Sequence, residues 1–141
     1  MAEYGQHPSS VLALKSAHDF DTTIARLKAA LAKAGARVFA DVDQREEAET
    51  AGLSLRRTRF ILFGNPKAGT PVMAANPHAA VELPLRMVIW EDNEGHTRLD
   101  YRDVSQTLGP LYGIDAEVLA PLQRVVGLLQ AAVHQAASES R

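Results

Sequence analysis

The chain begins with a pattern typical of a strand followed by a helix. Residues 10–17 contain a short apolar run of strand length. Asp19 then offers an N-cap, and Gly35 offers the backbone freedom that ends many helices. Between them, apolar residues recur at the spacing of one helix face: Phe20, Ile24, Leu27 and Leu31. The pattern therefore predicts one strand and one amphipathic helix.

Strand-like segments dominate the middle of the chain. Alternating residues predict a strand at 37–43, and an apolar run predicts another at 60–63. Residues 44–55 mix charged residues with alanine, which fits a short helix and an irregular connection equally well. Residues 87–91 and 96–102 enclose an acidic turn with a glycine, and they form the clearest hairpin pattern in the sequence.

The last third of the chain predicts a long helix introduced by Asp115. Its apolar stripe consists of Val118, Leu122, Val125, Leu129 and Val133. Pro121 lies inside this pattern, so we expect the first turn, residues 116–119, to be separate or kinked.

The predicted order is β-α-β-β-β-β-α, an α+β fold with an antiparallel sheet and two main helices on one face. We expect one domain over residues 10–137, a loose tail at 1–9 and a frayed end at 138–141. The 141 residues and 46% hydrophobic content suffice for one core.

Charge and composition narrow the classes of function. The net charge of −2 gives no basic footprint, so nucleic acid is not a predicted partner. The absence of cysteine excludes disulfides, thiolate nucleophiles and thiolate metal sites. The start lacks a signal-peptide pattern, and no window approaches the about 20 apolar residues of a membrane span. These features predict a cytoplasmic protein with no membrane partner.

Residues 60–86 form the most particular stretch of the sequence. Thr70 and Asn76 precede Pro71 and Pro77, which predicts two single-turn helices with these residues as caps. Pro84 then favours a return to extended backbone. We expect this segment to be held in a fixed, outward-facing shape and to carry any recognition.

Three segments carry a resemblance to a known family: FGNPKAGTPVM, LPLRMVIWED and TRLDYRD. Together they resemble the bacterial and archaeal domain of unknown function family 302, and the resemblance runs from Asp19 to the last helix. It implies a fold similar to the TATA-binding-protein-like or helix-grip class, a homodimer, and no established activity.

The chain departs from the family pattern at two places. Many relatives carry Asp-His where this chain has Asp43-Gln44, and Tyr-Asn-Asp-Pro where it has Tyr101-Arg102-Asp103-Val104. A proton-transfer or metal role of that histidine would therefore be lost here.

The turn after residue 63 is a candidate binding site. Residues 64–70 contain two glycines together with Asn65, Lys67 and Thr70. Backbone N–H groups of such a turn can bind an anion, but the lysine precedes the second glycine, so this is not a P-loop. Two interpretations stay open: a structural turn at the sheet edge, and a contact of Lys67 and Thr70 with a small anion or a peptide carboxylate.

Metal sites are not predicted. Residues 41–49 are rich in carboxylates but lack the spacing of a calcium loop, so a solvated acidic face is the simpler interpretation. The five histidines lack the paired spacing of zinc ligands, and we expect His96 to be exposed in the hairpin turn. No cofactor is predicted. Trp90 and Tyr101 either form the floor of a ligand pocket or pack in the core.

Three functions remain open. The first is a non-enzymatic binding module, acting as a homodimer, whose candidate ligand-binding residues are Asp43, Asn65, Lys67, Thr70, Trp90 and Tyr101. The second is a small enzyme with Asp43 as acid or base and with Lys67 and Tyr101 orienting the substrate. The third is a structural dimer joined through the sheet edge or the proline-rich segment, which exposed side chains at Val72 and Met73 would favour.

Overall fold

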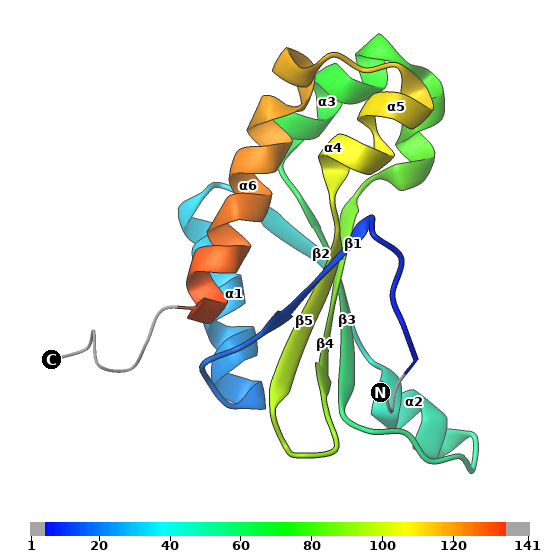
Figure 1. Ribbon diagram of the computed structural model, residues 1–141, viewed down its shortest axis with the longest axis vertical. Helices are drawn as coiled ribbons and strands as arrows, with labels where there is room; N and C mark the ends of the chain where they lie inside the picture. Colours follow the sequence, from blue (N-terminus) through cyan, green and yellow to red (C-terminus); the bar gives the residue numbers. More distant parts are fainter. Residues whose placement is uncertain (1–4, 135–141) are drawn as a thin grey trace, which may run out of the picture.

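The computed structural model describes residues 5–134 and contains a five-stranded antiparallel sheet (Figure 1). Across the sheet the strands follow the order β1-β5-β4-β3-β2. Their bounds are Val11–Lys15 for β1, Arg37–Asp43 for β2, Thr58–Gly64 for β3, Leu85–Glu91 for β4 and Thr97–Arg102 for β5. The predicted frayed end at 138–141 and the first four residues of the predicted tail lie outside the described residues.

Helical segments connect and follow the strands. Their bounds are Phe20–Lys33 for α1, Gln44–Thr50 for α2, Pro66–Ala75 for α3, Pro77–Glu82 for the 3-10 helix η1, Val104–Thr107 for α4, Gly109–Tyr112 for α5 and Ala116–His134 for α6. Leu83-Pro84, between η1 and β4, is a cis peptide bond.

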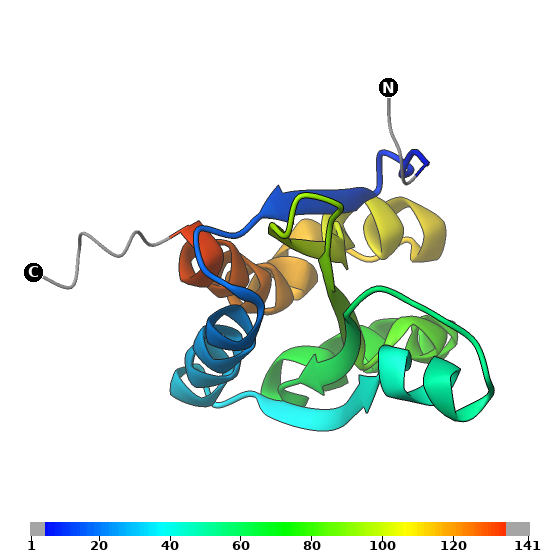
Figure 2. The same cartoon turned by 90° about the horizontal axis from the view of Figure 1, so that it is seen from below.

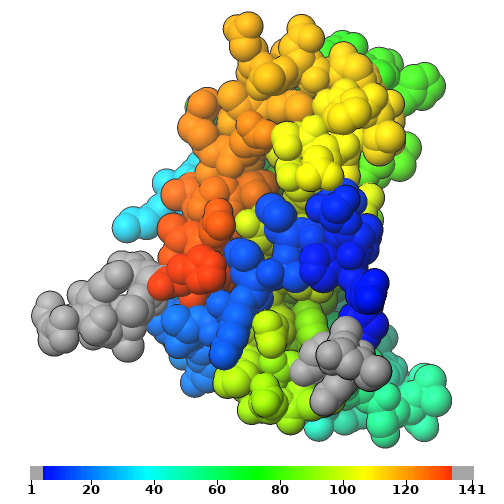
Figure 3. Space-filling view, viewed as in Figure 1, coloured from blue at the N-terminus to red at the C-terminus, as the bar shows by residue number. Residues whose placement is uncertain are grey.

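The two long helices, α1 and α6, pack against each other on one face of the sheet, and the sheet curves around them (Figure 2). The N–H of Ala17 donates to the carbonyl of Val133 at 2.9 Å, which ties the end of β1 to the end of α6. Figure 3 shows β1 and α6 side by side on one surface of the molecule. The predicted α+β fold, with an antiparallel sheet and two main helices on one face, is confirmed.

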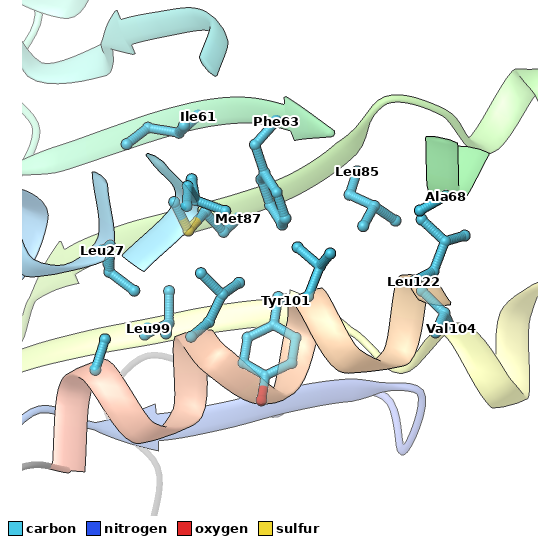
Figure 4. Close-up of a cluster of buried hydrophobic side chains, with 14 of the residues drawn as sticks. Leu27, Ile61, Phe63, Ala68, Leu85, Met87, Leu99, Tyr101, Val104 and Leu122 are labelled. Carbon is cyan, nitrogen blue, oxygen red and sulfur yellow. The ribbon is translucent and has the colours of Figure 1, made fainter. Parts of the chain in front are cut away.

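The hydrophobic core lies between the sheet and these two helices. Alternate residues of β3 and β4, among them Ile61, Phe63 and Met87, turn toward the helices and are fully buried (Figure 4). Leu27 of α1 and Leu122 of α6 meet them from the other side. This is the period-2 pattern of a sheet with one covered face.

The predicted first helix is confirmed together with both of its ends. The Asp19 carboxylate accepts the N–H of Thr22 at 2.8 Å and caps α1. Gly35 follows the helix with φ of +73°, a conformation that side chains other than glycine rarely adopt.

The prediction of two single-turn helices after residue 66 is only half right. The chain forms a ten-residue helix, α3, which continues through Pro71, and Asn65 caps it instead of Thr70. Buried Ala68 and Val72 anchor α3 to the core on both sides of the proline, so packing outweighs the lost backbone bond. Asn76 does cap η1, as expected, by accepting the N–H of His78 at 3.0 Å.

The last third of the chain differs from the sequence pattern at two places. Residues 104–112 form the short helices α4 and α5, which the sequence pattern did not indicate. Helix α6 is continuous from Ala116 to His134 with Pro121 inside it, so the expectation of a separate first turn was wrong. Leu119 and Leu122 are buried on either side of this proline and hold the turn against the core.

Among the described residues, α6 has a length and mean hydropathy that would allow it to cross a membrane, 19 residues and 1.2. The core helix of a soluble protein can have the same composition, and α6 packs along α1 and the sheet in this fold.

An ion-pair cluster joins α1, β2 and β3 around Asp41. Its carboxylate accepts both Nε and Nη2 of Arg59, at 2.8 and 2.6 Å, and Nζ of Lys28 at 2.6 Å. The hydrogen bonds from Arg59 are the main reason that the pKa of Asp41 falls from 3.8 to about 2. The cluster therefore connects the edge strand β2 to α1 and β3 through side-chain ion pairs.

Thr97→Val should stabilise the protein by about 1 kcal/mol, because the Thr97 hydroxyl is buried and has no hydrogen-bond partner. Valine has nearly the same shape and removes the desolvated polar group. Urea unfolding would measure the shift in midpoint.

Thr23→Val is the matched control for this prediction. The Thr23 hydroxyl is equally buried, but it lies 2.6 Å from the Ser16 hydroxyl and 3.3 Å from the His18 carbonyl. Its replacement by valine should destabilise the fold. Equal effects of the two variants on stability would contradict the claim that the Thr97 hydroxyl has no hydrogen-bond partner.

Candidate functional site

An open pocket of about 220 Å³ lies where β3 leads into α3. Its walls are mainly apolar and come from β2, α3, α6 and the segment before β4, through Phe39, Met73, Leu83, Pro84, Leu85 and Leu122. Pockets that bind drug-sized ligands usually have about 300–1,000 Å³. The volume here suits one ring or one branched hydrocarbon group.

Phe39 reaches the rim of the pocket because β2 contains a bulge. The register of β2 against β3 shifts between Val38 and Ala40, so Phe39 is the extra residue. Its side chain remains 45% exposed, and the Arg37 guanidinium lies 5.1 Å from the ring centroid.

Two of the residues that line the pocket, Gly64 and Gly69, have no side chain to occupy it. A Cβ on Gly64 would meet the Phe39 ring at 3.4 Å. A Cβ on Gly69 would lie 3.9 Å from Leu83 and 4.0 Å from Met73, at ordinary contact distance. Alanine would thus fit at position 69 and would favour the helix by about 1 kcal/mol. Glycine there costs helix stability and leaves space in the pocket.

The polar groups at the pocket are Asn65 and Thr70. The Asn65 side chain already accepts the N–H of Lys67 at 3.0 Å and donates to the Ala34 carbonyl at 3.4 Å. Within residues 5–134 the exposed Thr70 hydroxyl makes no hydrogen bond to the protein. It is therefore the group most available to a ligand.

Lys67 faces a second hollow, of about 250 Å³, on another side of α3. This hollow shares Asn65 with the apolar pocket and also contains Arg124 from α6. The structure thus brings Asn65 and Thr70 together, and it places Lys67 beside them but not in the same pocket.

Asp43 lies at the far end of β2. It pairs with Arg59, five residues before Gly64, which corresponds to roughly 17 Å along the strand. Its exposed carboxylate accepts the N–H of Glu46 at 3.0 Å and caps α2. Asp43 and Lys67 therefore do not share a site.

Trp90 and Tyr101 lie on opposite faces of the sheet and do not form one pocket floor. Tyr101 pairs with Met87 on the covered face, where burial is the main cause of its raised pKa (Figure 4). Trp90 pairs with Arg98 on the other face and donates its indole N–H to Asp100 at 3.1 Å. Burial raises the pKa of Asp100, and its Oδ1 has no partner.

A comparison with known families agrees with this architecture. The family model described as "Domain of unknown function DUF302" matches residues 12–133. The chain belongs to the DUF302 family. The resemblance noted from its sequence motifs is confirmed.

A solved DUF302 protein shares the fold. It is an uncharacterized conserved protein from Bacillus stearothermophilus, with a TM-score of 0.75 and 19% sequence identity. The match covers 89% of this chain and 97% of that one.

Curated relatives of the DUF302 chain are longer proteins. Proteins named fluoride-specific ion channel FluC 1, from Brucella suis and Brucella abortus, are 37% identical to it over 95 residues, which is 67% of this chain. The chain spans 37% and 35% of their lengths.

The departures from the family pattern lie away from the apolar pocket. Gln44 begins α2 next to Asp43. Asp103 caps α4 by accepting the N–H of Ser105 at 3.0 Å, and Val104 is buried behind it. Of the departing residues, Val104 thus belongs to the hydrophobic core.

The apolar residues that form most of the pocket, chiefly Phe39, Met73 and Leu83, were not predicted from the sequence. One signal was available. Gly69 belongs to the motif that resembles the family, and it lies inside helix α3. Glycine destabilises a helix interior, so its presence there indicates a role in packing or function.

Proposed function

We propose that this DUF302 chain is a non-enzymatic binding module, working as a homodimer, which holds a small and mainly apolar ligand in the pocket beside α3. The observation that carries the proposal is Gly69, a helix-interior glycine whose replacement by alanine would fit without a clash and would take up part of the pocket. The protein gives up helix stability at the position that keeps the cavity open.

The chemistry of the pocket walls supports a mainly apolar ligand. Apolar side chains surround the space, and the Thr70 hydroxyl is the polar group left over for orientation. A ring or branched chain with a single hydroxyl, amine or carboxylate group fits this arrangement. An organic anion is included in this class, because Lys67 lies in the adjoining hollow.

Indole, benzoate and a short peptide with a C-terminal phenylalanine are suitable probes. A ligand that binds the folded state raises the midpoint of thermal unfolding in a concentration-dependent manner. We expect at least one probe to do so and to shift the amide NMR signals of Gly69 and Thr70. If all three leave the midpoint and these signals unchanged, the proposal is wrong.

The homodimer is a separate part of the proposal and rests on the family resemblance. The expected apolar exposure at residues 72 and 73 does not support it, since Val72 is buried and Met73 is half-buried. Sedimentation velocity over a hundredfold dilution series should show a dimer that dissociates at the lowest concentrations. A monomer throughout would remove the dimer and leave the pocket assignment untouched.

A second candidate function is a role beside a fluoride-specific channel. The 37% identity to a segment of the Brucella channels favours it. A strain that lacks this chain should then grow more poorly in fluoride than its parent, and complementation should restore growth. Equal growth of the two strains would count against this role.

A further inference from the structure

The turn between β4 and β5 carries three side chains of metal-ligating type. Asp92, Glu94 and His96 each offer one ligand atom, and these atoms all lie within 4.8 Å of one another. The spacing Asp-x-Glu-x-His places the three on one side of the turn.

The His96 ring lies near both carboxylates without a hydrogen bond to either. Nδ1 of His96 lies 3.7 Å from Oδ2 of Asp92 and 3.7 Å from Oε1 of Glu94, which is too long for a hydrogen bond. Zinc ligands at about 2.0–2.2 Å from the ion are roughly 3.4 Å apart at the tetrahedral angle. Small rotations of the exposed Glu94 and His96 side chains would complete that geometry.

Asp92 is the fixed member of the group. Its side chain is buried, its Oδ1 accepts the N–H groups of Glu94 and His96 at 2.9 Å, and its Oδ2 accepts Nε of Arg98 at 2.9 Å. Arg98 orients the carboxylate as an outer partner does in many metal sites, and Oδ2 keeps a second lone pair on the side of His96.

We propose that Asp92, Glu94 and His96 form a binding site for a divalent transition-metal ion, with zinc as the test ion. The imidazole favours transition metals over magnesium or calcium, which prefer oxygen ligands alone. The exposed side of the turn leaves the remaining coordination positions to water. Since β4 separates this turn from the apolar pocket by its whole length, the site is independent of the proposed ligand.

Calorimetric titration of the full chain, expressed without a histidine tag, with zinc chloride at pH 7.5 would test the site. We expect one zinc ion per chain and weaker binding of calcium. Glu94→Gln and His96→Ala should each weaken zinc binding by about tenfold or more, because even outer partners of metal sites contribute 10–100-fold. Both residues are exposed, so neither change threatens the fold.

His78→Ala is the matched control, since His78 is also an exposed histidine but belongs to no such group among the described residues. It should bind zinc as the unaltered chain does. Zinc should also shift the amide NMR signals of residues 92–98 and leave Gly69 and Thr70 unchanged. Binding that survives both ligand variants, falls equally in His78→Ala or is tighter for calcium would overturn the proposal.

Discussion

Gly69→Ala should make the protein more stable and at the same time impair its pocket. The gain in helix stability is about 1 kcal/mol, because alanine loses less conformational freedom than glycine on entering α3. The added Cβ lies near Leu83 and Met73 without a clash and takes up ligand space. Overpacking by one carbon costs about 1–3 kcal/mol, so affinity for whichever probe binds should fall about tenfold.

Gly127→Ala separates the two effects. Gly127 also lies inside a helix, α6, but a Cβ there would meet nothing within 4 Å. This variant should gain similar stability in urea unfolding and bind the probe with unchanged affinity in a fluorescence or NMR titration. If both variants bind as well as the unaltered chain, Gly69 does not shape a binding site.

Asp41→Asn should lower the free energy of unfolding by about 2 kcal/mol at pH 7, and the loss should vanish near pH 2. Asp41 is 19% exposed, and its folded pKa of about 2 lies below the ordinary 3.8. A difference of this size corresponds to about 2 kcal/mol. Because the folded pKa is lowered, the stabilisation is present above pH 4 and is lost as the pH falls toward 2.

Urea unfolding of both proteins between pH 2 and pH 7 would measure this effect. Asp21→Asn is the matched control: Asp21 pairs with Arg57 at 2.8 Å, but its side chain is 79% exposed, so the pair contributes little. Two curves for Asp41→Asn and the unaltered chain that stay parallel down to pH 2 would contradict the assigned role of Asp41.

Local sequence signals were sufficient to predict those elements whose structure depends mainly on neighbouring residues. The Asp19 cap, the apolar stripe of α1 and the positive φ of Gly35 all follow from neighbouring residues. The hairpin of β4 and β5 could also be predicted locally, because the turn residues lie directly beside the alternating polar and apolar residues of the strands. Helix α3 could not be predicted in this way, since its continuation past Pro71 depends on the burial of Val72 in the core.

The candidate site was predicted only in part for the same reason. Asn65 and Thr70 belong to the motif that drew attention, and they do line the pocket. Phe39 reaches the pocket through a bulge that exists only in the pairing of β2 with β3, which no local pattern encodes. The opposite orientations of Trp90 and Tyr101 likewise depend on the strand register.

One edge of the sheet pairs β1 with β5, two strands that are far apart in the sequence. Val11 of β1 lies opposite Arg102 of β5, and the end of β1 bonds to the end of α6. Ribosomal synthesis therefore delivers β1 long before its partner strand exists. Contacts between residues so distant in sequence form slowly compared with local ones, so β1 has to remain without its partner strand until Arg102 has been synthesised.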